Sequence, residues 1–514
     1  MIPISEFTGP PGVLDSPEEV LSTLTRDGKR KWVYPFESRG RYWKARRIVG
    51  WVLIAFFVAL PIVRIGGKPA VFLDVLRREF TFFGTTFYPT DTFLLLMMGI
   101  ASLLVIILVT ALWGRVWCGW GCPQTVYMEF VFRPLENLIE GPPARRQRRD
   151  AKAKSIRDVW AAWRLSKQDA GTQAGFSAQQ KRAVAMLSKD IKTITEWMGR
   201  RAVKLSVFTL ISVFLAHTFV AYFAGWHNLI HWMTQPPAEH WGYFVLMAFT
   251  SGLVLFDFAY FREQMCTIAC PYARLQSALV DEDSLIVSYD PTRGEPRGKR
   301  RRTDAESPLG DCIDCGACVR TCPTGIDIRD GLQMECIACT QCIDACDPIM
   351  DKIGKPRGLI RYTSERALEG KDERTIRPRT IVYGLLIVLI SSLFVMALLQ
   401  RGSYKVNVGR AVSTEVYTAL PDGSIANRLR FRVHNLTDET RTFTVAGIEP
   451  STLTVRLVGP PAIALDAQEM IRVEAWVSTP ANSFEHDNEL PVTFAIRFDD
   501  GTEETVRFVL LGPG

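Results

Sequence analysis

The chain has 514 residues, of which 47% are hydrophobic and 22% are charged, and its formal net charge is +7. This length implies more than one domain, and the charged fraction excludes both a disordered chain and a channel made only of membrane spans. The 12 cysteines are placed unevenly, with none in the first 117 residues and none in the last 168. A secreted protein stapled by disulfides would spread its cysteines more evenly, so that class is disfavoured.

Five apolar stretches come close to the ~20 residues that a helix needs to cross a bilayer. In chain order they are 48–63, 92–113, 205–225, 241–261 and 380–399. The first is the shortest, and Pro61 and Arg64 stand at its far end. We therefore predict a multi-pass α-helical membrane protein, in which the first span has the least well-defined boundary.

The positions of lysine and arginine predict how these spans are oriented. Segments 1–47, 114–204 and 262–379 are rich in both residues, whereas 226–240 contains neither. Basic residues accumulate on the cytoplasmic side of bacterial membranes. The N-terminus is therefore expected in the cytoplasm, and five crossings place residues 400–514 outside. Beside membrane spans, the basic runs are explained by topology, and no nucleic-acid partner is expected.

Residues 400–514 read as an all-β domain. They carry 11 Lys plus Arg against 15 Asp plus Glu, a net charge of −4, which leaves +11 for the rest of the chain. Period-2 alternation with turn residues at regular spacing is typical of a β-sandwich. The expected strands include 428–433, 452–458, 471–477, 492–498 and 505–511. Without cysteines, this domain must be held together by its hydrophobic core.

The strongest chemical signal is the spacing C-x2-C-x2-C-x3-C, which occurs twice. Its cysteines are Cys312, Cys315, Cys318 and Cys322, followed by Cys336, Cys339, Cys342 and Cys346. In two-cluster bacterial ferredoxins the fourth cysteine of each motif binds the other cluster. We therefore predict two [4Fe–4S] clusters, one held by Cys312, Cys315, Cys318 and Cys346, and the other by Cys336, Cys339, Cys342 and Cys322. Zinc is the alternative, but zinc ribbons separate two C-x2-C pairs by a longer loop. The second motif departs from the pattern because Asp347 stands between Cys346 and Pro348.

The other four cysteines form two C-x3-C-P pairs, Cys118 with Cys122 and Cys266 with Cys270. Each pair follows a span that runs from outside to inside, so we expect four thiols to converge at the cytoplasmic membrane surface. Positions i and i+4 share a helix face, and the proline after each pair suits a helix start.

These four thiols are candidate metal ligands or redox groups. Soft thiolates suit Cu(I), zinc or a further iron–sulfur cluster, and the sequence does not choose among them. The neighbouring Arg115 and Arg262 are expected to lower the thiol pKa values. The simpler alternative is that the cysteines are small buried residues at span ends.

His217 lies about 12 residues inside the third span, roughly 18 Å deep at the helical rise of 1.5 Å per residue. Met97, Met98 and Met247 lie at comparable depth in other spans. Imidazole and thioether groups suit a copper ion in transit, and paired histidines could hold a haem. The competing interpretation is that His217 bonds a neighbouring helix and the methionines fill gaps. Asp257, close to Cys266, is a weaker candidate for handling protons.

The predicted regions are a cytoplasmic N-terminal segment (1–47), a four-helix membrane core (48–261) with a cytoplasmic loop (114–204), a cytoplasmic ferredoxin-like domain (262–379), a fifth transmembrane helix (380–399) and a periplasmic β-sandwich (400–514). Residues 144–204 mix charged and apolar residues at loosely helical spacing, which predicts one or two helices along the membrane face.

The order of these parts resembles the CcoG/FixG/RdxA family. The likeness rests on the spans followed by C-x3-C-P, the stretch 289–297, the double ferredoxin motif, the stretch 358–362, and the final span with its β-rich tail. The resemblance implies an immunoglobulin-like fold for the tail and a place in the bacterial inner membrane. It also implies a cupric reductase that makes Cu(I) during assembly of cbb3-type cytochrome c oxidase. The implied partners are copper ions, oxidase assembly factors or a copper transporter, membrane lipid and an unidentified cytoplasmic electron donor.

Three functional hypotheses follow from the residues and the resemblance. In the first, clusters beside a thiol site form a short electron path, and copper is a substrate or transient ligand at Cys118, Cys122, Cys266 and Cys270. Cu(II) prefers nitrogen and oxygen ligands, whereas Cu(I) prefers sulfur, so reduction at thiols would also retain the product. The second hypothesis is a quinol-linked electron carrier. The third is a copper-binding assembly scaffold without catalytic activity.

Overall fold

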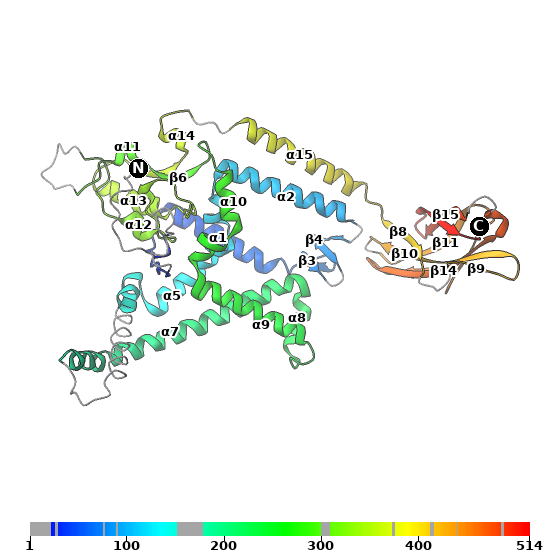
Figure 1. The fold of residues 1–514 in the computed structure, drawn as a ribbon, viewed down its shortest axis with the longest axis horizontal. Coiled ribbons are helices and arrows are strands. Elements are labelled where there is room, and N and C mark those ends of the chain that lie inside the picture. Colours follow the sequence, from blue (N-terminus) through cyan, green and yellow to red (C-terminus); the bar gives the residue numbers. More distant parts are fainter. Residues whose placement is uncertain are drawn as a thin grey trace. The chain divides into compact units, whose positions relative to one another are not determined.

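The computed structural model describes residues 22–25, 29–75, 78–88, 91–151, 178–299, 309–372, 376–411, 416–437, 439–484 and 488–513. The chain divides into two compact units, which we call unit 1 (Met1–Ser392) and unit 2 (Leu393–Gly514). Unit 1 is mainly helical and contains all the cysteines, whereas unit 2 is built mainly of strands (Figure 1).

The helices of unit 1 include α1 (Arg41–Ala59), α2 (Thr92–Trp113), α3 (Val116–Trp120), α4 (Pro123–Tyr127), α5 (Arg133–Glu140), α7 (Ala178–Ala224), α8 (Trp226–Met233), α9 (Trp241–Phe256), α10 (Pro271–Leu279), α11 (Pro291–Gly294), α12 (Ala317–Thr321), α13 (Gln341–Lys352), α14 (Glu365–Leu368) and α15 (Pro378–Leu399), which runs on into unit 2. The π-helical segments are η4 (Met128–Phe132), η5 (Asp257–Phe261) and η6 (Met265–Ala269), and η7 (Ile328–Asp330) is a 3₁₀ turn. Its strands are β1 (Arg64–Ile65), β2 (Lys68–Pro69), β3 (Val71–Asp74), β4 (Glu79–Phe82), β5 (Thr85–Phe87), β6 (Ile286–Tyr289) and β7 (Ile360–Thr363).

Among the described residues, four helices are long and apolar enough to cross a membrane. They are Thr92–Trp113, Thr195–Ala224, Trp241–Phe261 and Pro378–Leu399. Helices therefore cover the second to fifth predicted spans.

The first predicted span, 48–63, is wrong in its bounds. The helix α1 begins at Arg41, inside the basic segment, and ends at Ala59. Proline has no N–H to continue a helix and disfavours helical geometry in the residue before it, so the helix ends ahead of Pro61. With basic residues in its first half, α1 is not among the helices that meet the length and composition of a span.

The helices expected over 144–204 also differ from the prediction. From Ala178 to Ala224 the chain forms one continuous helix, so the segment before the third span is an extension of that span. Residues 152–177 lie outside the described part of the chain.

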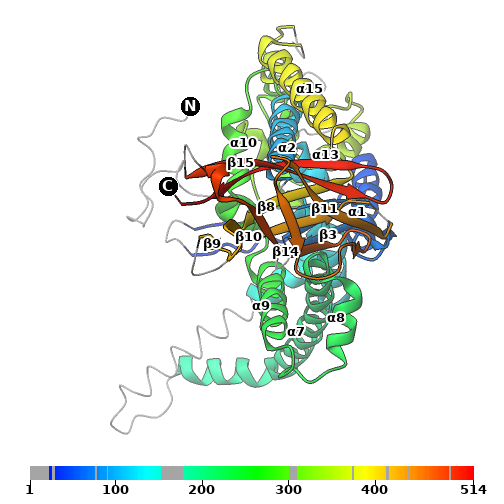
Figure 2. The same ribbon diagram turned by 90° about the vertical axis from the view of Figure 1, so that its right-hand side faces the viewer.

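A helical hairpin anchors the cysteine motifs. α7 and α9 are joined through α8, and both views place the three helices together (Figures 1 and 2). In its core, Phe132 stacks on Phe258 with ring centroids 4.2 Å apart and packs edge-on against Phe208 of α7. Phe132 belongs to η4, which follows the first C-x3-C-P pair, and Phe258 belongs to η5, which precedes the second. This contact therefore fixes the two pairs relative to each other.

The ferredoxin-like part of unit 1 combines α12, α13 and a small antiparallel sheet. β6 pairs with β7 so that Tyr289 faces Ile360. Val287, Ile343 and Leu359 are almost fully buried in its core. The stretches 289–297 and 358–362, on which the family resemblance partly rests, therefore begin or end in neighbouring strands.

Unit 2 is a two-layer β-sandwich, as predicted. Its strands are β8 (Tyr404–Arg410), β9 (Thr418–Ala419), β10 (Ser424–Asn435), β11 (Arg441–Glu449), β12 (Thr454–Leu457), β13 (Ile463–Leu465), β14 (Met470–Pro480), β15 (Glu489–Phe498) and β16 (Glu503–Leu511). One sheet has the order β12-β14-β10-β8, with β9 also paired to β10, and the other has the order β13-β11-β15-β16. The five predicted strands are confirmed, while β8, β9, β11 and β13 were not singled out by the alternation.

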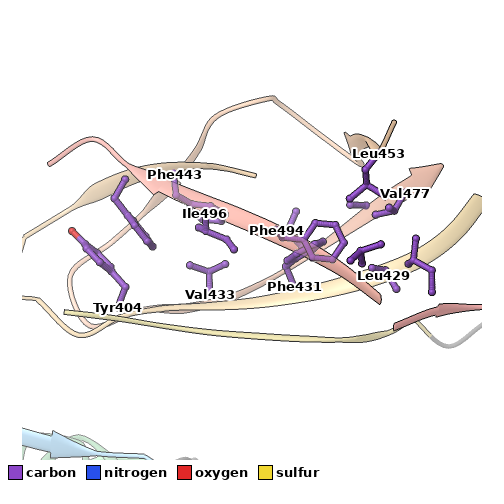
Figure 3. Packing of buried hydrophobic residues seen from close by; sticks show 14 of the residues in the cluster. Tyr404, Leu429, Phe431, Val433, Phe443, Leu453, Val477, Phe494 and Ile496 are labelled. Atoms are coloured by element: carbon purple, nitrogen blue, oxygen red, sulfur yellow. The ribbon is translucent and has the colours of Figure 1, made fainter. Parts of the chain in front are cut away.

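The core of unit 2 lies between these two sheets. Leu429, Phe431 and Val433 alternate along β10 and point inward, where Phe431 meets Phe494 of β15 edge-on at 5.2 Å (Figure 3). All four side chains are 0% exposed, which explains how a domain without cysteines holds together. Period-2 burial on both sheets is what the alternating sequence predicts.

Candidate iron–sulfur and thiol site

A small cavity in the ferredoxin-like region collects the cysteines assigned to one cluster. It is lined by Cys322 from the first motif and by Cys336, Cys339 and Cys342 from the second, with Cys318 also at its wall. Its other walls include Val287, Ile326, Ile328 and Ile337. Four thiols in an apolar cradle fit a [4Fe–4S] cluster, and Cys322 lies with the second motif as the crossed arrangement requires.

The second crossed set also comes together. The thiol of Cys346, on α13, has Cys318, Cys315 and Cys312 among its electrostatic neighbours. Burial, together with these neighbouring thiols, raises the pKa of Cys346 to about 12. Iron would have to displace the thiol protons, since thiolates are the ligands of iron–sulfur clusters.

The two motifs adopt the same local backbone. The residue before the second cysteine is left-handed in each, Asp314 with φ 51° and Ala338 with φ 52°. The residue after that cysteine is left-handed as well, Gly316 and Thr340 both having φ 61°. Alternation of left- and right-handed residues curls a chain so that its N–H groups point into one concavity, which suits an anionic cluster. Three of the four are not glycine, so the surrounding structure must hold this conformation in place.

Asp347, which separates Cys346 from Pro348 in the second motif, lies inside the helix α13. The first motif leaves its helix at Cys322, whereas α13 continues past Cys346 and includes Pro348. Asp347 accepts a hydrogen bond from the Gly358 N–H at 3.1 Å. The extra residue therefore ties the second motif to the segment that precedes β7.

The C-x3-C-P pairs are each followed by a helix, as predicted. Pro123 and Pro271 occupy the first turn of α4 and α10. The prediction that the two cysteines of a pair share one helix face is wrong. Cys118 lies in α3 and Cys266 in η6, but Cys122 and Cys270 are extended residues that precede the next helix, with ψ of 125° and 112°.

The four thiols do converge. Cys122, Cys118 and Cys270 are all electrostatic neighbours of Cys266, and burial is the main cause that raises its pKa. Burial also raises the pKa of Cys118 to about 12, and the Cys118 Sγ bonds Gln276 Oε1 at 3.1 Å. Without a metal, the thiols of Cys118 and Cys266 are therefore protonated at physiological pH, and metal binding there would release protons.

The predicted lowering of the thiol pKa values is confirmed only in part, because Arg115 lowers the pKa of Cys118 but does not outweigh burial, and Arg262 acts on another group. Arg262 is engaged by Glu136, which it contacts through both carboxylate oxygens at 3.1 and 3.0 Å. Arg115 lowers the pKa of Cys118, but burial outweighs it, and its guanidinium donates to the Ala273 carbonyl at 2.6 Å. No sequence pattern pairs Arg262 with Glu136 or Arg115 with the Ala273 carbonyl, since both contacts join residues far apart in the chain.

The thiol site and the cluster cavity lie against each other. A Cβ added to Gly119, between Cys118 and Cys122, would lie 2.6 Å from the Ile337 carbonyl oxygen, so the two backbones are in contact. Ile337 lines the cluster cavity and also a neighbouring small cavity that includes Cys266. Only one layer of residues therefore separates the two sets of thiols.

Arg46 clamps this contact. Its side chain is fully buried, and it donates from Nε to the Gly119 carbonyl and from Nη1 to the Cys339 carbonyl, both at 2.8 Å. One guanidinium thus joins the C-x3-C-P loop to the cluster loop. In the sequence Arg46 was only one of several basic residues used to orient the chain, and nothing in the pattern separated it from Arg47.

The two remaining candidate residues are Asp257 and His217. Gln124 donates to Asp257 at 3.2 Å and to the Arg262 carbonyl, which places Asp257 beside the thiol site. The Nδ1 of His217 lies 2.7 Å from the Val213 carbonyl of its own helix. This contact is thus to the i−4 carbonyl of the same helix, and not to a neighbouring helix as the competing interpretation expected. A metal role for His217 remains a prediction.

Within the described residues, no three His, Cys, Asp or Glu side chains converge closely enough to hold a single metal ion. An iron–sulfur cluster is larger than one ion, so its cysteines lie farther apart than the ligands of a mononuclear site. At Cys118, Cys122, Cys266 and Cys270, a single copper ion would require the thiol side chains to rotate inward.

Three family models match the chain. A 4Fe-4S dicluster domain covers residues 261–365, a 4Fe-4S binding domain covers 95–142, and the immunoglobulin-like fold at the C-terminus of FixG covers 394–513. The second match includes Cys118 and Cys122, outside the double ferredoxin motif. A crystal structure of a FixG-related protein from Vibrio parahaemolyticus aligns over its whole length with 22% of this chain, at 10% sequence identity and a TM-score of 0.20.

Curated relatives match over almost the whole length. RdxA of Cereibacter sphaeroides is 32% identical over 91% of this chain and 93% of its own. RdxB of the same organism is also 32% identical, and the nitrogen fixation protein FixG of Rhizobium meliloti is 28% identical over 90% of this chain and 89% of its own. The chain therefore belongs to the RdxA/FixG family of [4Fe–4S] proteins, which carry out electron transfer.

Proposed function

We propose that this protein is a membrane-bound oxidoreductase that reduces Cu(II) to Cu(I) at the four-thiol site, for copper delivery during assembly of a cbb3-type oxidase. The observation that carries the proposal is the contact between Gly119 and the cluster loop, fixed by Arg46. A [4Fe–4S] cluster supplies electrons one at a time, which matches the one-electron reduction of Cu(II).

The residues at the thiol site offer ligands for both oxidation states of copper. The amide oxygen of Gln276 lies beside Cys118, and the carboxylate of Asp257 is an electrostatic neighbour of Cys122 and Cys266. Oxygen ligands suit Cu(II), and the thiolates suit Cu(I) once it forms. The residues thus support a site that accepts the substrate and retains the product.

We also propose a multi-pass arrangement in the bacterial inner membrane, with the cluster region in the cytoplasm and unit 2 in the periplasm. α1 supports a fifth membrane-embedded helix, because Ile48, Val52 and Phe56 are 67%, 61% and 53% exposed on one side of it. Apolar side chains at i, i+4 and i+8 form a stripe that suits lipid. Protease protection of unit 2 in intact spheroplasts, against digestion in inverted vesicles, would contradict the proposed sidedness.

A second candidate function is an electron carrier with a further [4Fe–4S] cluster at the four thiols. The match of a 4Fe-4S binding domain to residues 95–142 favours it. Iron analysis separates the two candidates, because a third cluster raises the iron content from eight to twelve atoms per chain. The scaffold hypothesis is separated by turnover, since a scaffold would bind Cu(I) without producing it.

The test is an anaerobic Cu(I)-chelator assay on protein whose clusters have been reduced and freed of excess reductant. Wild type should release one Cu(I) for each stored electron. The double variant Cys118→Ser, Cys266→Ser should keep both cluster signals and lose Cu(I) formation, while His217→Gln serves as a matched control inside the membrane. Equal copper reduction by a cluster-free Cys312→Ser, Cys336→Ser variant would sink the proposal.

A further inference from the structure

A second and larger cavity opens on the other side of the cluster loop. It has a volume of about 730 Å³, and its lining includes Cys336, Val287 and Met334. Cys336 and Val287 also line the small cavity assigned to the cluster. A molecule bound in the large cavity would therefore touch a cluster ligand without passing through the four-thiol site.

The cavity lies at the ends of two candidate membrane spans. The loop that forms its rim is pinned to the last turn of α2, because the Ser284 hydroxyl donates to the Ala111 carbonyl at 2.8 Å and the Leu285 N–H donates to the Leu112 carbonyl at 3.0 Å. Arg377, directly before α15, donates to the same Ala111 carbonyl. In the proposed membrane arrangement, the cavity therefore opens at the bilayer surface.

The chemistry of the lining selects a class of ligand. Leu332 and Met334 are 48% and 60% exposed at its edge, and Trp113, the last residue of α2, is 50% exposed. Exposed apolar groups and tryptophan at a span end suit a lipid-soluble molecule. The size falls within the range of small-molecule sites.

The charges argue against an anionic donor. Four carboxylates line the cavity, those of Asp281, Glu282, Asp283 and Glu365. Arg115, the cation among the described residues of the lining, already donates to the Met334 and Ala273 carbonyls. Arg377 and Arg366 pair with Asp281 and Asp283, which leaves Glu282 and Glu365 as the carboxylates that would repel the phosphates of a nicotinamide or flavin nucleotide. A neutral donor meets no such repulsion.

We propose that this cavity binds a neutral, membrane-soluble quinol as the electron donor. Oxidation of one quinol to quinone releases two electrons and two protons, which balances the one-electron reduction of two Cu(II) ions. Asp281 and Asp283 are held by Arg377 and Arg366, so Glu282 and Glu365 are placed to accept the protons and pass them to water. The transfer of the electrons to copper rests on the proposed function, whereas the binding of quinol in this cavity does not.

Binding is tested first, by photolabelling the full-length protein in detergent with a short-chain azido-ubiquinone. Label should appear in residues 278–287 and 332–338. Ala278→Trp fills the cavity from its exposed wall and should lower labelling by at least about tenfold. Leu275→Trp, another exposed position on α10 that lies outside the lining, should leave labelling unchanged. Label elsewhere, or label that Ala278→Trp does not lower, would overturn the proposal.

Electron donation is tested with decylubiquinol, Cu(II) and a Cu(I) chelator, measured above the protein-free background. Ala278→Trp should slow quinol-driven Cu(I) formation by about tenfold or more, and should leave Cu(I) formation from pre-reduced protein unchanged. If pre-reduced wild type makes no Cu(I) but the azido-quinone still labels the cavity, the copper proposal fails and the quinol site stands. If pre-reduced protein makes Cu(I) and quinol does not drive it, the quinol site is wrong and copper reduction stands.

Discussion

The ferredoxin-like region and the β-sandwich of unit 2 are stabilised in opposite ways. In the first, cysteines make up much of the core and the loops depend on left-handed residues and buried polar contacts. In the second, Leu429, Phe431 and Phe494 are fully buried and no cysteine is present. The comparison teaches that one chain combines a region whose structure depends on its cofactor with a domain that depends on apolar packing alone.

The largest expected effect is removal of a cluster ligand. Cys339→Ser should cost the ferredoxin-like region several kcal/mol, because metal-binding free energy is also folding free energy there. Hydrogen exchange should rise across residues 312–346 and stay unchanged in unit 2. Cys270→Ser, at the thiol site, is the matched control and should leave both cluster signals intact. A loss of protection in unit 2 would break the comparison.

A core truncation in unit 2 should have the converse effect. Phe431→Ala removes a fully buried ring and should destabilise unit 2 by about 3–5 kcal/mol. Thermal unfolding followed by hydrogen exchange of unit 2 peptides measures the loss, with the exposed Val458→Ala as control. The EPR signals of the clusters should be the same as in wild type, and a change in them would show that the two regions are not independent.

Acid should destabilise the thiol-site side of unit 1 more than unit 2. Burial opposes ionisation of Glu136, but Arg262, Arg146 and Lys204 together hold the pKa of that carboxyl well below its usual 4.5. A lowered folded-state pKa gives stability that is present above about pH 4.5 and is lost as the pH falls below it. In unit 2, Arg430 lowers the pKa of Glu474, but that side chain is 24% exposed, against 4% for Glu136, and is more strongly screened by solvent.

The variant Glu136→Gln tests this difference. It should cost about 3 kcal/mol at pH 7, because the buried cations of Arg262, Arg146 and Lys204 lose the carboxylate that they share. It should also flatten the acid limb of the stability curve of unit 1 between about pH 4.5 and pH 3. Glu474→Gln is the control and should leave that limb unchanged. An acid limb that persists in Glu136→Gln would assign the acid sensitivity to other groups.

Replacement of Arg46 should have the smallest effect on stability and a specific effect on electron transfer. Arg46→Ala removes two buried hydrogen bonds and should cost about 2–3 kcal/mol. It should shift the potential of the cluster beside Cys339, because a buried positive charge favours the reduced, more negative cluster. The neighbouring Arg47→Ala is the matched control. If potentiometric EPR shows the same cluster potential in Arg46→Ala as in wild type, the role of Arg46 is structural only.

Much of this architecture can be predicted from short sequence patterns. The spacing of the eight ferredoxin cysteines predicted the crossed sets that the fold brings together, because the fourth position of each motif is dictated by cluster geometry. Alternation predicted the strands around Phe431, and the prolines after Cys122 and Cys270 predicted helix starts. These features depend on residues close together in the sequence.

The errors arose where distant residues decide the outcome. The thiol pKa values rise because Cys118 and Cys266 are buried and because Arg262 is held by Glu136, which lies in another helix. Arg46 became a clamp only because Gly119 and Cys339 meet in the fold. From the sequence, Arg46 served only to predict the membrane orientation. Its contacts with the thiol and cluster loops are visible only in the tertiary structure.

The most direct test of electron transfer between the two sets of thiols is a single-turnover EPR measurement. Protein with reduced clusters, free of other reductant, is mixed anaerobically with one Cu(II) per cluster and frozen at intervals. The account predicts that the reduced-cluster and Cu(II) signals disappear together, one for one, and that both persist in Cys118→Ser, Cys266→Ser. Equal loss of both signals in that variant, or Cu(II) that stays oxidised beside reduced clusters in wild type, would contradict it.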